Sequence, residues 1–460
     1  MESRLNFITE KPRQTPITEK ADVIVAGGGL TGVMAAVAAA GAGCSVVLIE
    51  SKAYLGGVAT MGLPIQGYVN QNNERIVAGL AENFRLRLIK MNGATEDFIN
   101  CAMHNPYLIV DPEKVKLVCQ EMLYQAGVKF LLHTQVVDTI VEDGRITALL
   151  VEGKSGREAL IAKEFIDCTG DADIAARSGV PFSLGSEKDG SLQAATLNFR
   201  MDGVDIQALM RALFDNPERY DLHNLLPRKQ FRGSRHHIMV GLGNLIEEAK
   251  QDGFDGHIWK CVNYITQLDE NAVSINSVHV KDKNGCDTRD LTFIETDARS
   301  QVQEVIRFLK LYVPGFENAF LTFTAGWAGI RETRRIKGMK TITVEDIRAG
   351  NRPNDTIALG GYPIDIHSPN DNGLVFEKVP TYGIPYGCLV PEKIDNLLVA
   401  GRSISATHEA MASTRLMAQC MALGEAAGTA AALCCKGSES VRDVDVTKIQ
   451  KLLISGGACI

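Results

Sequence analysis

About thirty residues near the start of the chain, from Ala21 to Glu50, constrain the fold more than any other stretch. They read ADVIVAGGGLTGVMAAVAAAGAGCSVVLIE: an apolar run, a glycine-rich turn of the form G-x-G-x-x-G, an alanine-rich run, and a second apolar run that ends in an acid. This order predicts a strand, a phosphate-binding loop, a helix and a second strand in one βαβ unit. We therefore expect an α/β protein with a parallel sheet.

The glycines of this motif are Gly27, Gly29 and Gly32. The first permits a tight turn, the second lets a pyrophosphate approach the backbone, and the third lets the helix pack closely on the strand. The helix start offers unpaired N–H groups and a partial positive charge to phosphate. Glu50 follows the second apolar run, where an acid accepts hydrogen bonds from a ribose. The stretch predicts a dinucleotide site, and the alternative is a glycine-rich turn in an ordinary βαβ unit.

The composition limits the partners. The chain has 460 residues, which suggests two or three domains, and its net charge of −7 argues against non-specific nucleic-acid binding. No apolar run reaches the ~20 residues of a membrane helix, and the polar first segment lacks an apolar signal core. The 11 cysteines form no C-x-x-C pair. They are expected to be reduced thiols of a cytoplasmic protein, without a metal site or a membrane span.

The pattern of the chain predicts a discontinuous domain. Strand and glycine-turn signals fill residues 21–180 and return in 381–460, where a strand at 397–400 and a glycine turn precede an alanine-rich helix from about Met411 to Leu433. We expect this helix to be buried against the sheet. Residues 181–380 have more charge and mixed periodicity, including a basic segment at 228–237 and an amphipathic helix from Asp297 that ends at Pro314. They are predicted to form an inserted domain, and residues 1–20 an N-terminal extension.

Several motifs together resemble a known family. They are GGGLTG with its acid, LGGVAT, IDCTGDADIA, GIRETRRIKG, YPIDIHSP, YGIPYGCLVP and AGRSISATHEAMASTR. With them the chain resembles the two-domain FAD-dependent oxidoreductases whose first domain is of the glutathione-reductase type. That group is distantly related to fumarate reductase and succinate dehydrogenase flavoproteins. The resemblance implies a Rossmann-like FAD-binding domain, discontinuous in sequence, with an inserted α+β substrate or cap domain.

The resemblance also implies where FAD binds. The residues carried over are Gly27, Gly29, Leu30, Thr31 and Gly32 for the pyrophosphate; Glu50 and Ser51 for the adenosine ribose; Gly57, Ala59 and Thr60 beside the isoalloxazine; Val136 for the adenine; Thr169 and Gly170 near the pyrophosphate; and Gly401, Arg402 and Ser413 for the ribityl chain and ring. Many relatives have Arg or His around the second glycine pair, where this chain has Leu55 and Val58. We therefore expect non-covalent FAD.

We expect hydride transfer between the flavin N5 and a small organic substrate, with an acid or base beside it. His408 is the first candidate for the base, although an isolated histidine is often structural. Arg415, placed in the first turn of the late helix, and Arg331, grouped with Arg334 and Arg335, could bind a substrate carboxylate. A salt-bridged surface turn is the alternative for this arginine group. His367 is a further candidate.

Three other functions compete with this hypothesis. A flavin monooxygenase usually has a late G-D motif beside the flavin, where this chain has Gly401-Arg402. A non-catalytic flavoprotein subunit and a simple NAD dehydrogenase are the other two alternatives. The sequence leaves the substrate, the electron donor or acceptor, and assembly as a homo-oligomer open.

Overall fold

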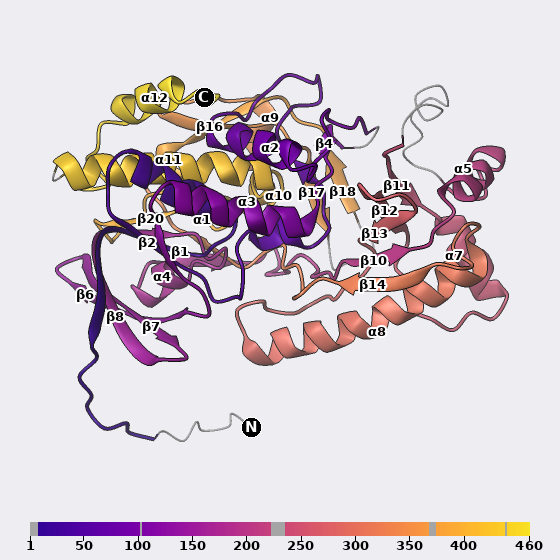
Figure 1. Cartoon of the computed structure of the whole chain (residues 1–460), viewed down its shortest axis with the longest axis horizontal. Helices are drawn as coiled ribbons and strands as arrows, with labels where there is room; N and C mark the ends of the chain where they lie inside the picture. Colours follow the sequence, from indigo (N-terminus) through magenta and orange to yellow (C-terminus); the bar gives the residue numbers. More distant parts are fainter. Residues whose placement is uncertain (1–7, 102–103, 222–234, 368–373, 438) are drawn as a thin grey trace.

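The computed structural model describes residues 8–101, 104–221, 235–367, 374–437 and 439–460. Most of the basic segment 228–237, and residues 1–7 of the N-terminal extension, lie outside these ranges. Two sheets dominate the described fold, and they lie at opposite ends of the view in Figure 1.

The larger sheet has seven strands in the order β5-β2-β1-β8-β7-β6, with β20 beside β8. Its strands are β1 (Ile17–Ala26), β2 (Val46–Ile49), β5 (Lys129–Leu131), β6 (Gln135–Glu142), β7 (Arg145–Gly153), β8 (Gly156–Asp167) and β20 (Leu397–Val399). The pairs β5–β2, β2–β1, β1–β8 and β8–β20 are parallel, whereas β6 and β7 form an antiparallel hairpin. Because β20 joins this sheet from far downstream, the predicted α/β class with a discontinuous parallel sheet is confirmed.

Helix α11 (Met417–Gly437) packs along α1 (Leu30–Gly41), and Figure 1 shows the two helices on one side of the sheet. The backbones approach closely because α11 presents glycines: a Cβ on Gly424 would lie 2.1 Å from the Thr31 carbonyl oxygen, and one on Gly428 would lie 2.2 Å from that of Ala35. The late helix was expected to pack on the sheet, and it packs extensively on another helix as well.

The single helix predicted from Met411 to Leu433 is wrong. The structure has α10 (His408–Thr414) and α11 instead, with an angle of 92° between their axes. Every residue type at the break tolerates a helix, so local propensity gives no signal for it. Tertiary contacts lie close to the bend, and one of them is the hydrogen bond from Ser413 Oγ to the Tyr362 carbonyl. No single helix in the described ranges is long and apolar enough to span a membrane; only α10 and α11 taken together pass on length and composition.

The smaller sheet is antiparallel, in the order β11-β12-β13-β10-β14, and α8 lies beside it in Figure 1. Its elements are β10 (Phe199–Asp202), β11 (Ile238–Gly241), β12 (Val262–Thr266), β13 (Ala272–Ile275), β14 (Phe320–Thr324), α5 (Ile206–Asp215), α7 (Gly243–Gln251) and α8 (Thr288–Tyr312). Helix α8 begins nine residues before the predicted Asp297, because Asp287 caps it by accepting from the backbone N–H of Arg289 and Asp290. It ends before Pro314, as predicted.

The remaining elements belong to neither of these two sheets. They are η1 (Gly57–Thr60), β3 (Ile65–Gln66), α2 (Leu80–Lys90), β4 (Tyr107–Leu108), α3 (Pro112–Gln125), α4 (Asp173–Arg177), β9 (Phe182–Leu184), β15 (Arg334–Ile336), α9 (Val344–Ala349), β16 (Thr356–Gly360), β17 (Ile364–His367), β18 (Leu374–Glu377), β19 (Tyr382–Pro385), η2 (Tyr386–Cys388) and α12 (Val446–Ser455). Side chains between Ile342 and Val379 join the core around α1 and α11. The domain boundaries near 180 and 380 stay predictions.

Replacing Glu164 by Gln is expected to stabilise the protein at alkaline pH. This carboxyl is buried in β8, its Oε2 has no hydrogen-bond partner in the described structure, and burial raises its pKa to about 8. Between about pH 4.5 and 8 the folded protein keeps a proton that the unfolded chain has lost, so stability falls as pH rises through this window. We expect Glu164→Gln to raise Tm by ~2–4 °C at pH 8.5 and by less at pH 5. Thermal unfolding at both pH values measures the change in Tm. An equal change in Tm at pH 5 and pH 8.5 would contradict the prediction.

Candidate functional site

The first glycine turn connects β1 to α1, and its backbone leaves no room for side chains at two positions. A Cβ on Gly27, whose φ is +102°, would lie 2.3 Å from the Cys168 carbonyl oxygen. One on Gly32 would lie 1.8 Å from the carbonyl oxygen of Gly27. Helix α1 begins at Leu30 after Gly29, so the unpaired N–H groups of its first turn belong to Leu30, Thr31 and Gly32.

The carboxylate of Glu50 lies at the end of β2, beside this turn. It accepts hydrogen bonds from the Gly28 N–H (2.6 Å), the Lys52 N–H (2.7 Å) and the Ser51 hydroxyl (3.1 Å). The segment after β5 runs next to it, since the backbone N–H of Thr134 donates to the Glu50 carbonyl at 2.9 Å. Val136 follows two residues later as a buried residue of β6.

The second glycine pair lies against the first turn. The Gly56 N–H donates to the Gly28 carbonyl at 2.9 Å, and a Cβ on Gly57 would lie 2.9 Å from the Cα of Gly29. Gly57 opens η1, in which the Thr60 hydroxyl donates to the Gly57 carbonyl at 2.7 Å and Ala59 is fully buried. The two glycine loops thus contact each other through their backbone.

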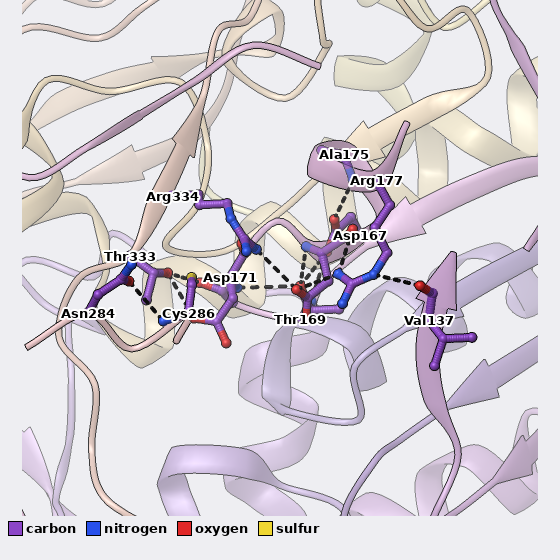
Figure 2. Close-up of polar contacts among 12 residues, drawn as sticks. Val137, Asp167, Thr169, Asp171, Ala175, Arg177, Asn284, Cys286, Thr333 and Arg334 are labelled. Carbon is purple, nitrogen blue, oxygen red and sulfur yellow. Dashed lines mark hydrogen bonds and ion pairs between the residues drawn. The ribbon is translucent and has the colours of Figure 1, made fainter. Parts of the chain in front are cut away.

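The loop after β8 adds a third segment, which Figure 2 shows as a network of polar contacts. Asp167 accepts from the Thr169 hydroxyl at 2.7 Å and from the backbone N–H of Thr169 and Ala175, and burial raises its pKa to about 6. Asp171 accepts from the Thr333 hydroxyl at 2.8 Å, and its carbonyl accepts from Arg334 at 2.9 Å. This network joins the loop to the GIRETRRIKG segment.

Arg402 belongs to the same junction. Its guanidinium donates to the Gly170 carbonyl at 2.6 Å, to the Asp171 carboxylate and to the Ile330 carbonyl. Gly401, just before it, lies beside α1, where an added Cβ would be 3.3 Å from the Thr31 hydroxyl oxygen. The structure therefore places three predicted cofactor segments around the start of α1. They are the second glycine pair, the loop after β8, and Gly401 with Arg402.

The three arginines expected to share a carboxylate site have separate partners. Arg334 forms an ion pair with Asp173 at 3.1 Å, and the buried Arg335 contacts Glu332 and Glu187. Arg331 differs, because within the described residues it has no carboxylate partner and donates to the Ala194 carbonyl at 2.5 Å. The interpretation as a surface turn is also wrong, since Glu332 and Arg335 are almost completely buried.

Arg415 lies at the break between α10 and α11, not in the first turn of one long helix. It donates to the Arg331 carbonyl at 3.2 Å and to the Asp365 carbonyl at 3.0 Å. Burial and the charge of Arg415 lower the pKa of Arg331 to about 9, and burial also lowers that of Arg415. The guanidinium groups of Arg331 and Arg415 are thus neighbours. Asp365 is the acid whose charge raises the pKa of both.

His408 begins α10 and lies in a buried network. Its Nδ1 is 2.8 Å from Oε1 of Glu332, and its backbone N–H donates to Glu187. Ser413, on the same helix, is fully buried; its hydroxyl donates to the Tyr362 carbonyl at 2.5 Å and lies 2.7 Å from the Tyr382 hydroxyl. The hydrogen bonds of the Ser413 hydroxyl therefore go to other residues of the protein.

A cavity of about 90 Å³ lies between the smaller sheet and the segment after η1. It is lined by Leu63, Pro64, Gln66, His104, Ile238, Val240, Trp259, Cys261, Asn263, Ile265, Asn276, His279, Tyr362, Asp365 and His367. His367 is thus a wall residue, as is Asp365 two positions before it on β17. His408, Arg331 and Arg415 are not wall residues of this cavity.

The comparison with protein families decides the identity of the chain. The model of the family described as FAD dependent oxidoreductase matches residues 22–453. This chain belongs to that family. The match includes residues of both sheets and of both ends of the discontinuous sheet, so the protein is an FAD-dependent oxidoreductase by family.

Several solved structures are similar to this chain over most of its length. The myxobacterial chondrochloren halogenase superposes with a TM-score of 0.51 at 12% identity, covering 94% of this chain and 78% of that one. A flavin-dependent brominase gives 0.49 at 13%, with 94% and 83% covered. A geranylgeranyl bacteriochlorophyll reductase-like protein from Thermoplasma acidophilum gives 0.46 at 12%, with 95% and 83% covered. A search of curated proteins by sequence gave no match.

The glycine loops of this FAD-dependent oxidoreductase fit the cofactor of the family. Gly27 and Gly32 are positions that any Cβ would block, and the Glu50 carboxylate is an acceptor beside the same turn. A phosphate-binding turn and a ribose acceptor require this combination.

Sequence reasoning missed three cavity residues of the oxidoreductase: Asp365, His279 and Trp259. Asp365 could have been found, because residues two apart on a strand point to the same face and His367 was already a candidate. His279 and Trp259 are isolated in the sequence, and only the tertiary fold stacks their rings, with centroids 3.8 Å apart.

Proposed function

We propose that this FAD-dependent oxidoreductase transfers a hydride between flavin N5 and a small organic substrate that carries a carboxylate. Bound FAD would supply the two-electron redox chemistry. The observation that carries the proposal is the pair Arg331 and Arg415, two neighbouring guanidinium groups that have no carboxylate ion-pair partner among the described residues. A flavin monooxygenase and a non-catalytic subunit remain the alternatives.

The proposed cofactor site is built around the first glycine turn, the second glycine pair and the loop after β8. The first turn, with Gly27, Gly29, Leu30, Thr31 and Gly32, would hold the pyrophosphate, and Glu50 with Ser51 would accept from the ribose. Val136, Thr169 and Gly170 would border the adenosine half; Gly57, Ala59, Thr60, Gly401 and Arg402 would border the rest. Because its hydroxyl already contacts Tyr362 and Tyr382, Ser413 would act through its position and not through that hydroxyl.

Electrostatics support a carboxylate ligand at the arginine pair. Each guanidinium lowers the pKa of a neighbour: the charge of Arg415 acts on Arg331, and both act on His367. An anion placed between them would relieve this repulsion, and guanidinium binds carboxylate in a bidentate manner. Helix α11 begins at Met417, two residues after Arg415, and the unpaired N–H groups of its first turn add to the positive potential.

Two histidines are available for proton transfer. His367 lines the cavity, and burial together with the charge of Arg331 lowers its pKa to about 4, so it is neutral near pH 7 and can accept a proton. His408 is held at Nδ1 by Glu332, which leaves Nε2 as its free nitrogen in the described structure. We propose that His367 takes part in proton transfer at this cavity, with His408 as the second candidate.

Arg331→Met and Arg415→Met test the proposal. In the FAD-loaded protein, we expect small carboxylates such as succinate, pyruvate and benzoate to perturb the visible flavin spectrum, and their amides not to. Each substitution should weaken this binding at least ~10-fold, because a hydrogen bond to a charged group contributes about 1.5–3 kcal/mol.

Arg348→Met is the matched control, since this exposed arginine pairs with Glu377 on the surface. It should leave the titration unchanged. Wild-type protein with bound flavin that responds to no carboxylate, or equal responses of wild type and both variants, would contradict the proposal.

A further inference from the structure

Three side chains of the cavity form a line of contacts from a carboxylate to a buried imidazole. Asp365 Oδ1 lies 3.4 Å from Nε2 of His367, and Nδ1 of His367 lies 3.2 Å from Nε2 of His279. The His279 ring is stacked on Trp259, with an angle of 17° between the planes. One imidazole in this His–His hydrogen bond donates and the other accepts, so a proton can pass between them.

The line is held rigidly by its surroundings. The backbone N–H of His279 donates to the side chain of Gln301 on α8, and the Gln301 amide donates back to the His279 carbonyl, both at 3.1 Å. The backbone N–H of His367 donates to Gln193 at 3.3 Å, and its carbonyl accepts from Ala194. Ala194 also accepts from Arg331, so one short segment joins the arginine pair to the histidine line.

The charges around the histidines are mostly positive. Those facing the pair are Arg331 from the loop before β15, Arg415 from the α10–α11 break, Lys281, and Asp365 from β17 as the acid. Burial and these cations keep the pKa values of both histidines below the ordinary value, so both are neutral near pH 7. Burial alone would raise the pKa of Asp365, but the contact with His367 and the nearby cations hold it below its ordinary value.

We propose that Asp365, His367 and His279 form a proton relay that serves the hydroxyl group of a 2-hydroxy carboxylate substrate. The inference rests on the proposed function and names its substrate class. A neutral imidazole pair backed by a carboxylate accepts a proton from a hydroxyl. A substrate ammonium group is disfavoured, because three cations against one acid leave the site with an excess of positive charge.

The step balances in either direction. In oxidation, the C–H bond of the hydroxyl-bearing carbon breaks and its hydrogen leaves with the electron pair, for which the FAD of this family is the acceptor. The O–H bond breaks, its proton goes to Nδ1 of His279, which has no hydrogen-bond partner in the described structure, and the carbon–oxygen bond becomes double. The substrate loses two electrons and becomes a 2-oxo carboxylate. The carboxylate of Asp365 stabilises the imidazolium that forms.

The test compares two substrate classes on FAD-loaded protein under anaerobic conditions. Lactate, malate, 2-hydroxyglutarate and mandelate are matched with alanine, aspartate, glutamate and phenylglycine, and loss of the visible flavin absorbance is recorded. At least one hydroxy acid is expected to reduce the flavin, and its amino acid partner at least ~10-fold more slowly. His279→Gln should slow reduction about 100-fold, and His367→Gln and Asp365→Asn about 10-fold, with the pH profile shifted.

His257→Gln is the matched control, because this histidine is exposed and outside the cavity. A second readout avoids turnover: in protein labelled with ¹⁵N-histidine, Asp365→Asn should shift the ring signals of both His367 and His279. Reduction by amino acids and not by hydroxy acids, reduction by neither class, or a shift confined to His367 would each overturn the relay. If the proposed function is wrong, wild type and Arg331→Met respond equally in the carboxylate titration. That result distinguishes its failure from a failure of the relay.

Discussion

Gly32→Ala is expected to give a colourless protein that fails to take up added FAD. The new Cβ would lie 1.8 Å from the Gly27 carbonyl oxygen, and that obstacle is backbone that cannot rotate away. Relief requires α1 to move from β1 or the turn to open, and either change displaces the N–H groups of the first turn. We expect FAD affinity to fall at least ~100-fold, which corresponds to about 2.8 kcal/mol, the upper range of overpacking costs.

Gly41→Ala is the matched control on the same helix. Its added Cβ meets nothing within 4 Å, and alanine is the better helix former by up to about 1 kcal/mol. It should keep the flavin spectrum and retain or raise Tm. Flavin content after purification and FAD titration of the apoprotein measure both variants. Normal FAD binding by Gly32→Ala would show that this turn does not hold the pyrophosphate.

Gly424→Ala should have the second largest effect, and it acts through packing. The Cβ would lie 2.1 Å from the Thr31 carbonyl oxygen, so α11 cannot keep its contact with α1. Because Thr31 belongs to the first turn of α1, a shift there disturbs the proposed phosphate site. We expect a loss of about 2–3 kcal/mol in stability and weaker FAD binding.

Gly437→Ala provides the comparison at the other end of α11, where an added Cβ makes ordinary contacts at 3.6 Å or more. Urea unfolding should show a clearly lower free energy of unfolding for Gly424→Ala than for Gly437→Ala. Equal stability would mean that α11 and α1 are not in tight contact in solution. Lower stability with unchanged FAD affinity would show that the helix pair supports the fold without shaping the site.

The candidate site was only partly accessible to sequence reasoning. Gly27, Gly32 and Glu50 could be predicted because a phosphate turn depends on residues that are close in sequence. The sequence grouped Arg331 with Arg334 and Arg335. The spacing of these residues does not indicate that Arg334 pairs with Asp173. Nor does it indicate that Arg335 pairs with Glu187 and Glu332. His279 gave no signal, since its partners His367 and Trp259 come from other segments.

The sequence by itself determined the βαβ unit, the family, the cofactor and the return of the chain to its first sheet. These depend on local patterns: strand and helix periodicity, glycine positions, and an acid after the second strand. Only the tertiary structure decided the bend between α10 and α11, the contact of Gly424 with α1, and the line from Asp365 to His279. Each of these depends on which distant backbone or side chain lies within a few ångströms, and no local propensity encodes that distance.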